Sequence, residues 1–232
     1  MTKKATEVFD VWANDGSAEE MEDGHAGPVQ VAVSQMDLLA GETILDLGCG
    51  NGWATRMLAG ITSAPAIGID GAPSMVERAR QLSSDFPDIT FEQASFEALP
   101  VESETIDRVF SMEALYYALD PAVVIAEIYR VLKSGGRTEI IVNFFRENKM
   151  TERWAEVLGV SMQWLGEDDW AELFRSAGFD LVETRRVADP KGPGREDEFA
   201  PEPWCPTWPE KVDFYEQGSL WVRAKKPGSS SG

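Results

Sequence analysis

The sequence predicts an α/β protein built on a doubly wound, mostly parallel sheet. Segments of strand length alternate with helix-forming segments along most of the 232 residues, which is the pattern of successive βαβ units. The first strand segment, 43–47, runs directly into a glycine-rich turn, 48–52, and then into a helical segment. The length suits one α/β domain, and the 43% hydrophobic content is that of a globular protein.

The N-terminal half follows this alternation closely. Before the first strand we expect a short amphipathic helix over 4–15, a polar and mobile segment over 15–27, and a helical pattern over 29–39. Pro73 and the Ser74-x-x-Glu77 pattern mark the start of a later helix. After the glycine-rich turn the expected elements are, in order, a helix over 53–59, a strand over 66–70, a helix from 73 to about 84, and strands near 89–92 and 106–110.

The C-terminal half begins with the best-marked helix of the chain. Asp120 caps this helix, Pro121 takes its first position, and Gly135-Gly136 ends it. The elements expected after it are a strand over 138–144, helices near 148–160 and 167–177, a strand over 179–187, a long loop over 189–210 and a final strand over 219–225. Because no helix is expected between the last two strands, they should pair antiparallel at one edge of the sheet.

Charge and cysteine content restrict the partners and the compartment. There are 40 acidic and 21 basic residues, a formal net charge of −19, which disfavours a nucleic-acid partner because phosphate backbones are repelled. High-salt adaptation and an ordinary acidic enzyme both remain open. No run approaches the roughly 20 apolar residues of a membrane span, and the N-terminus lacks the apolar region of a signal peptide. Cys49 and Cys205 are far apart, so a cytoplasmic location is expected.

The glycine-rich turn and the second strand suggest a nucleotide site. Glycine allows positive φ angles and lets a ligand lie against the backbone, and the following helix presents its N–H groups to that ligand. The spacing is G-x-G-x-G, and Trp53 stands where the dinucleotide fingerprint G-x-G-x-x-G needs a glycine. Asp70 ends the second strand, where a carboxylate can accept both hydroxyls of an adenosine ribose. A solvated aspartate in an ordinary turn is the alternative.

The stretch Asp46-Leu47-Gly48-Cys49-Gly50-Asn51-Gly52 resembles motif I of the class I S-adenosylmethionine-dependent methyltransferases, E/D-x-G-x-G-x-G. The resemblance covers roughly 40–187 and is similar in kind to the quinone-, sterol- and amine-methylating branch. It implies a seven-stranded sheet with a C-terminal antiparallel strand pair, and S-adenosylmethionine as the cofactor. It also implies a cofactor-binding set that begins with Asp46, Gly48, Cys49, Gly50, Gly52, Asp70, Gly71 and Met75.

Two later segments extend this set. The segment 93–100 looks like the family's G-D-A-E-x-L-P, with Ser95 where an acidic residue usually bonds the adenine amino group. Phe96 either contacts the adenine or packs in the core. After the fourth strand, Ser111 and Met112 are placed near the methionine portion of the cofactor.

Candidates for contact with the methyl acceptor are few. Tyr116 and Tyr117 align with a histidine pair of related enzymes, or else pack under the next helix, and Glu113 lies beside them. His25, the only histidine, is either a base near the acceptor or an exposed loop residue. No catalytic residue is assigned, and Tyr117, Glu113 and His25 remain weak candidates. Phe9 and Trp12 either cover the cofactor or simply dock the first helix.

The expected organisation is a single methyltransferase domain over 1–227 with a flexible tail at 228–232. Within it, we expect an N-terminal helical lid region, a cofactor-binding core, a loop or lid and a last strand, over 1–40, 41–187, 188–217 and 218–227. No cluster of histidine, aspartate and glutamate has metal-ligand spacing, so no metal is expected.

The predicted function is methyl transfer from S-adenosylmethionine to a small-molecule acceptor by in-line displacement. A dedicated base is needed only if the acceptor arrives protonated. RNA or protein methylation, and a non-catalytic cofactor-binding module, are the alternatives. The sequence specifies neither the acceptor nor the oligomeric state.

Overall fold

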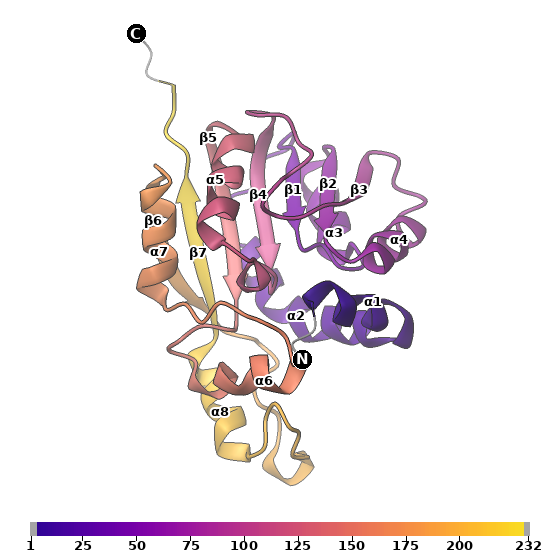
Figure 1. The fold of residues 1–232 in the computed structure, drawn as a ribbon, viewed down its shortest axis with the longest axis vertical. Helices are drawn as coiled ribbons and strands as arrows, with labels where there is room; N and C mark the ends of the chain where they lie inside the picture. Colours follow the sequence, from indigo (N-terminus) through magenta and orange to yellow (C-terminus); the bar gives the residue numbers. More distant parts are fainter. Residues whose placement is uncertain (1–3, 230–232) are drawn as a thin grey trace.

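The structure is a computed structural model that describes residues 4–229. Its centre is a seven-stranded sheet in the order β3-β2-β1-β4-β5-β7-β6. β1 to β5 run parallel, and β7 lies antiparallel between β5 and β6 (Figure 1). The doubly wound fold with an antiparallel pair at its end is thereby confirmed. The strands are β1 (Ile44–Leu47), β2 (Ala66–Asp70), β3 (Ile89–Gln93), β4 (Ile106–Met112), β5 (Leu132–Val142), β6 (Asp180–Val187) and β7 (Ser219–Lys225).

Helices cover both faces of the sheet because successive strand side chains point to opposite faces. Leu45 and Leu47 join the buried cluster that contains α5 and α7, whereas Ile44 joins the cluster that contains α2 and α3. Both faces are therefore apolar, as expected for parallel strands buried on two sides. The helices are α1 (Ala5–Asp15), α2 (Ser17–Val33), α3 (Trp53–Thr62), α4 (Pro73–Leu82), α5 (Pro121–Val131), α6 (Trp154–Leu158), α7 (Glu167–Ser176) and α8 (Trp208–Gln217).

The N-terminal region differs from the prediction. The segment expected to be mobile over 15–27 is mostly helical and forms the first half of α2. Only Gly16, at φ +95°, separates α2 from α1. Ala18 and Gly27 of this segment are buried, so packing of small side chains holds a helix that the polar composition hides. The structure has no helix at 34–39.

The C-terminal half differs from the sequence prediction at three elements. Helix α5 ends at Val131 and β5 begins at Leu132, so Gly135-Gly136 lies inside the strand and does not end the helix. The segment expected to be helical over 148–160 holds only a short 3-10 turn, Lys149–Arg153, and α6. Helix α8 lies between the last two strands, where a loop was expected.

The capping box predicted from Ser74 and Glu77 does not form at α4. Pro73 opens the helix as predicted, but the N-cap residue is Ala72 and no side chain caps it. The Ser74 backbone N–H instead donates to Asp10 Oδ1 at 2.8 Å. This bond attaches α1 to the start of α4.

Four helices gather where the parallel strands end. Figure 1 shows α1, α2, α6 and α8 in the lower half of the molecule, below the arrowheads of β4 and β5. Helix α1 packs against α2 and α4. In open α/β sheets this carboxyl edge is where ligands bind.

Removal of the Asp120 cap is expected to cause a measurable loss of stability. Its Oδ1 accepts from the backbone N–H groups of Ala122 at 3.0 Å and Val123 at 3.4 Å. Asp120→Ala is expected to lower the free energy of unfolding by about 1 kcal/mol, the usual cost of losing an N-cap. Urea unfolding measures this, with the exposed Asp85→Ala as the control. Equal stability of the two variants would contradict the capping role.

Candidate active site

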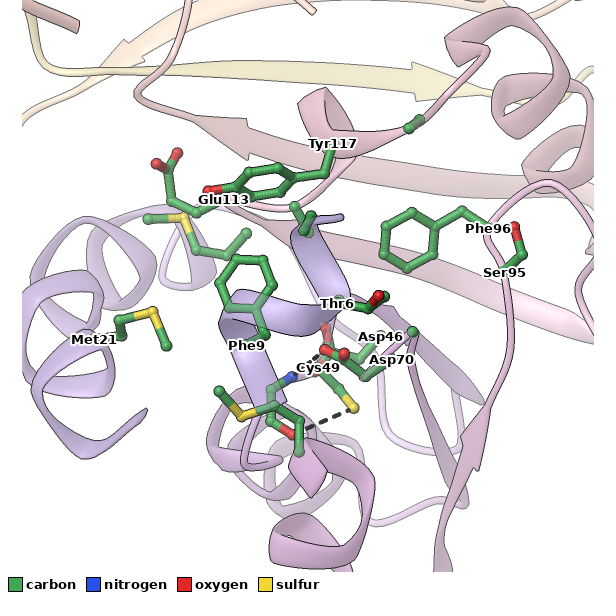
Figure 2. A pocket seen from close by; sticks show the side chains of 18 of the residues that line it. Thr6, Phe9, Met21, Asp46, Cys49, Asp70, Ser95, Phe96, Glu113 and Tyr117 are labelled. Carbon is green, nitrogen blue, oxygen red and sulfur yellow. Dashed lines mark hydrogen bonds between the residues drawn. The ribbon is translucent and has the colours of Figure 1, made fainter. Parts of the chain in front are cut away.

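A cavity of about 710 Å³ lies at the carboxyl ends of β1, β2 and β4. Its floor comes from the glycine-rich turn and the strand ends, and α1 and α2 contribute Phe9, Met21 and His25 from the other side. Figure 2 shows Glu113 and Tyr117 at one side of the cavity, Asp46, Cys49 and Asp70 at another, and Ser95 and Phe96 at a third. The size and the few convergent polar groups are those of a small-ligand site.

The three glycines of the turn have different roles. All have positive φ, +76° at Gly48, +53° at Gly50 and +82° at Gly52. A Cβ on Gly48 would lie 2.1 Å from the Ala114 Cβ, and one on Gly52 would lie 2.6 Å from the Phe91 ring, so these two positions are needed for internal packing. A Cβ on Gly50 would meet nothing within 4 Å. Gly50 lines the cavity, whereas Gly52 does not.

Asp70 connects the turn to α4. Its Oδ2 accepts from the Gly50 N–H at 3.0 Å (Figure 2), and its Oδ1 accepts from the Ala72 N–H at 2.9 Å. Each carboxylate oxygen can accept two hydrogen bonds, so each retains one acceptor site. Burial raises the pKa of Asp70, against the lowering effect of the two N–H donors. The carboxyl group is thus positioned to accept from a diol.

Asp46 lies beneath the turn and is almost fully buried. Its Oδ2 accepts from the Thr55 hydroxyl at 2.6 Å. Burial raises the pKa of Asp46 to about 7, and the negative charge of Asp70 adds to the shift. Burial and the same two carboxylates raise the pKa of the Cys49 thiol. Cys49 therefore stays a neutral thiol and is not a nucleophile.

This raised pKa makes stability depend on pH. The unfolded chain releases the Asp46 proton near 3.8, and the folded protein holds it to about 7. The folded state thus binds more protons in this window, so stability falls as pH rises from about 4 to 7. Asp46→Asn cannot ionise and should show a shallower fall in urea midpoint over the same range. Parallel pH profiles for wild type and variant would contradict the buried, protonated carboxyl.

The segment after β3 supplies one wall of the cavity. Ser95 and Phe96 both line it, and Phe96 also packs against the main buried cluster, so this side chain borders the cavity and belongs to the core. The Ser95 hydroxyl bonds the Glu97 carboxylate. Glu97 also lines the cavity and accepts from the Leu119 N–H at 2.9 Å. The family resemblance puts an acidic residue at position 95, where this chain has Ser95. The carboxylate that lines the cavity here is that of Glu97, two residues later.

The end of β4 places Met112 at the cavity but not Ser111. Ser111 is fully buried and its hydroxyl donates to the Leu47 carbonyl at 2.7 Å. Neighbouring strand residues point to opposite faces, so only Met112 reaches the cavity. The expected position of Ser111 at the cavity is therefore corrected: it does not line the cavity. Gly71 and Met75, by contrast, do line it.

Glu113 is held in a strained and buried position. Its φ is +54°, which is uncommon for a residue with a side chain. Its carboxyl group accepts from the Tyr116 hydroxyl at 2.9 Å and from the Asn143 backbone N–H. Burial raises the pKa of Glu113 to about 8. The surrounding structure fixes this side chain where it borders the cavity.

The two tyrosines of this segment differ in their position toward the first cavity. Tyr117 lines it, with its ring centroid 5.1 Å from that of Phe9, whereas Tyr116 is buried and does not line it. His25 is part of α2, not of a loop, and it is partly buried. Burial lowers the pKa of His25 to about 4, so its imidazole is neutral near pH 7.

Beside Phe9 and His25, three residues of the N-terminal helices that the sequence did not indicate also close the cavity. Thr6, Met21 and Glu22 line it, and the Asn51 side chain donates to Glu22 Oε2 at 3.0 Å. This bond ties α2 to the glycine-rich turn. No sequence signal marks these positions once 15–27 is taken as mobile.

Within residues 4–229 no group of three or more histidine, cysteine, aspartate or glutamate side chains could hold a metal ion. In the same range, no helix is both long and apolar enough to cross a bilayer.

The residues present fit a cofactor with a ribose and a positive charge. Gly50 leaves open space against the backbone, and Asp70 retains acceptor sites for a diol. Acidic residues line the cavity, and within the described part of the chain the only lysine or arginine that does so is Lys4. Such a lining favours a sulfonium cation over an anionic ligand.

Comparisons with known proteins agree with this geometry. Residues 45–140 match the family model described as a methyltransferase domain. A solved Haloferax volcanii chain, a methyltransferase candidate in complex with the Trm112 methyltransferase activator, is 34% identical with a TM-score of 0.89, covering 98% of this chain and 100% of that chain.

Curated relatives are similar over shorter stretches. An O-methyltransferase of Penicillium expansum is 31% identical over 64% of this chain and 56% of its own length. A sterol 24-C-methyltransferase of Pneumocystis carinii is 27% identical over 66% of this chain and 44% of its own length. The chain thus spans only about half the length of these two relatives.

Four observations agree on the family: the glycine-rich turn, the acid at the end of β2, the strand order, and the similarity to the Haloferax chain over nearly the whole of this chain. The chain belongs to the class I S-adenosylmethionine-dependent methyltransferases, with S-adenosylmethionine as its cofactor.

Proposed function

We propose that this protein transfers the methyl group of S-adenosylmethionine to a small-molecule acceptor. The observation that supports the proposal is a second cavity of about 490 Å³ that adjoins the first. Both cavities share the lining residues Phe9, Met21, His25, Glu113 and Tyr117. A recess of this size suits a small ligand, and it is not the open basic groove that a nucleic acid needs.

The residues of the first cavity have distinct proposed roles toward the cofactor. Asp70 accepts from the ribose hydroxyls, the backbone at Gly50 leaves room for the ligand, and Phe96 with Ser95 borders the adenine. Asp46, Cys49, Gly71, Met75 and Met112 complete the enclosure, whereas Gly48 and Gly52 act indirectly by allowing the turn to pack. The bound cofactor supplies an activated methyl group on a sulfonium. The protein then contributes orientation and exclusion of water.

A protein partner is a second part of the proposal. The Haloferax chain was solved with the Trm112 methyltransferase activator, and its 34% identity extends over nearly all of this chain. We therefore expect a Trm112-type activator to bind this protein as well. Co-expression and co-purification would test this, and failure to form a complex at several salt concentrations would contradict it.

The acceptor class can be tested by following the transferred methyl group. The protein is incubated with methyl-labelled S-adenosylmethionine and a cell extract divided into molecules below about 1 kDa, RNA and protein. We expect label in the first fraction, with Asp70→Ala as a control of reduced cofactor binding. Label confined to RNA or protein would overturn the acceptor class, and cofactor binding without any labelled product would favour a non-catalytic module.

A further inference from the structure

Aromatic rings from four helical elements line part of the second cavity. Helix α1 contributes Phe9 and Trp12, the 3-10 turn Leu115–Tyr117 contributes Tyr117, and α6 and α8 contribute Trp154 and Phe214. The rings also pack against one another: the ring centroids are 5.1 Å apart for Phe9 and Tyr117 and 5.9 Å apart for Trp154 and Phe214. Aromatic faces of this kind attract cations and pack well against apolar bodies.

Three carboxylic acids line this cavity. Glu20 enters from α2 and Asp189 from the loop after β6, with Glu113 at the side of the first cavity. In the described part of the chain no lysine or arginine lines the cavity. The remaining titratable side chains facing it are Tyr116, Tyr117, Tyr215 and His25, and His25 is neutral near pH 7 because burial lowers its pKa to about 4. An anionic acceptor would meet no lysine or arginine side chain among the described residues of this lining, whereas a cation would meet the carboxyl groups of Glu20 and Asp189 and that of Glu113 beside the first cavity.

Glu113 occupies the boundary between the two cavities. It lines both of them and is only 9% exposed. The Tyr116 hydroxyl and the Asn143 N–H hold its two oxygens, and each oxygen keeps a further acceptor site. The outer side of the second cavity opens to solvent near Trp204 and Val157, each 41% exposed. A molecule entering there would bring its leading group toward Glu113.

We infer that the methyl acceptor is an amine on an apolar body, that it occupies the second cavity, and that Glu113 receives the proton of its ammonium group. This inference rests on the proposed function and adds the acceptor class and the role of one residue.

The proton and electron balance of the step is simple. Burial raises the pKa of Glu113 to about 8, so this carboxyl first loses its own proton to water as the ammonium binds. An N–H bond of the ammonium then breaks, its electron pair stays on nitrogen, and the proton forms an O–H bond on the Glu113 carboxylate. The nitrogen lone pair then forms the N–C bond to the methyl group, while the S–C bond breaks and leaves its electron pair on sulfur. One positive charge passes from sulfur to nitrogen, and Glu113 later returns its proton to water. Burial brings the pKa of this carboxyl nearer to that of an amine, which improves a general base.

The first test compares three probes that share a benzyl group and differ in charge: benzyltrimethylammonium, phenylacetamide and phenylacetate. Each is titrated into the full-length protein saturated with S-adenosylhomocysteine, so that only the second cavity is free. We expect the cation to bind at least tenfold more tightly than the anion. Equal affinities, or preference for phenylacetate, would overturn the inference.

The second test identifies the proton carried by Glu113. Benzyltrimethylammonium has no N–H, so any proton released on its binding comes from the protein. At pH 7 we expect calorimetry in buffers of different ionisation enthalpy to detect up to one proton released by wild type and none by Glu113→Gln, with weaker binding by that variant. Glu156→Gln is the matched control, because Glu156 is exposed on α6 and does not line the cavity. Unchanged proton release in Glu113→Gln would overturn the role of Glu113.

Two readouts separate this inference from the proposed function. Binding of S-adenosylmethionine is measured on the same samples, and thermal unfolding shows whether each variant is folded. If the cofactor does not bind, the proposed function fails. If it binds while the probe series on wild type shows no charge preference, only the amine inference fails.

Discussion

Gly50→Val is expected to abolish S-adenosylmethionine binding while the protein remains folded. A Cβ at Gly50 has no protein atom within 4 Å, because the space beside it is the cavity. The valine methyl groups would therefore occupy the volume proposed for the cofactor. Calorimetric titration should show no detectable heat of binding.

Backbone strain alone could also weaken this variant, because Gly50 has φ +53° and a β-branched residue is strained there. Gly41→Val is the matched control: Gly41 has φ +88°, its Cβ also meets nothing within 4 Å, and it lies outside the cavity. We expect both variants to lose some thermal stability and only Gly50→Val to lose binding. Normal affinity in Gly50→Val would mean that the turn does not contact the cofactor.

Asp70→Ala is expected to weaken S-adenosylmethionine binding by about 1.5–3 kcal/mol, the range for hydrogen bonds to a charged group. This corresponds to a rise in Kd of roughly 10- to 150-fold. The reason is that the Asp70 carboxylate lies between the turn and α4, held by the N–H groups of Gly50 and Ala72. Asp88→Ala, an exposed change on the loop before β3, should leave the Kd unaltered.

Asp70 also supports the turn, so the ribose contact needs its own test. Adenosine and 2′,3′-dideoxyadenosine differ only in the two ribose hydroxyls. If Asp70 binds those hydroxyls, Asp70→Ala should weaken adenosine binding and leave dideoxyadenosine binding nearly unchanged. An equal loss for both ligands would show that Asp70 acts only through the shape of the turn.

Local sequence patterns predicted some strands of the sheet with the right bounds. The strands at 66–70 and 219–225 were predicted with the bounds that the structure has, because each is an apolar run between turn residues. The first half of helix α2 was missed because the residues that it buries are small ones such as Ala18 and Gly27, which leave no apolar stripe in the sequence. Helix α8 was missed because it has no fully buried residue.

The candidate site divides in the same way. Gly50 and Asp70 line the cavity where the sequence placed them, because each sits at a fixed place in a βα unit. Ser111 was misplaced because a one-residue step along β4 turns the side chain to the other face. Thr6, Met21 and Glu22 could not be found, since they reach the cavity only through the tertiary packing of α1 and α2.

The most direct measurement is calorimetric titration of the protein with S-adenosylmethionine, S-adenosylhomocysteine and NAD, at low and high salt. Binding of the first two at micromolar concentrations, and no binding of NAD, is the predicted result. Failure of both S-adenosyl compounds to bind the folded protein at either salt concentration would contradict the assignment of this cavity as the cofactor site.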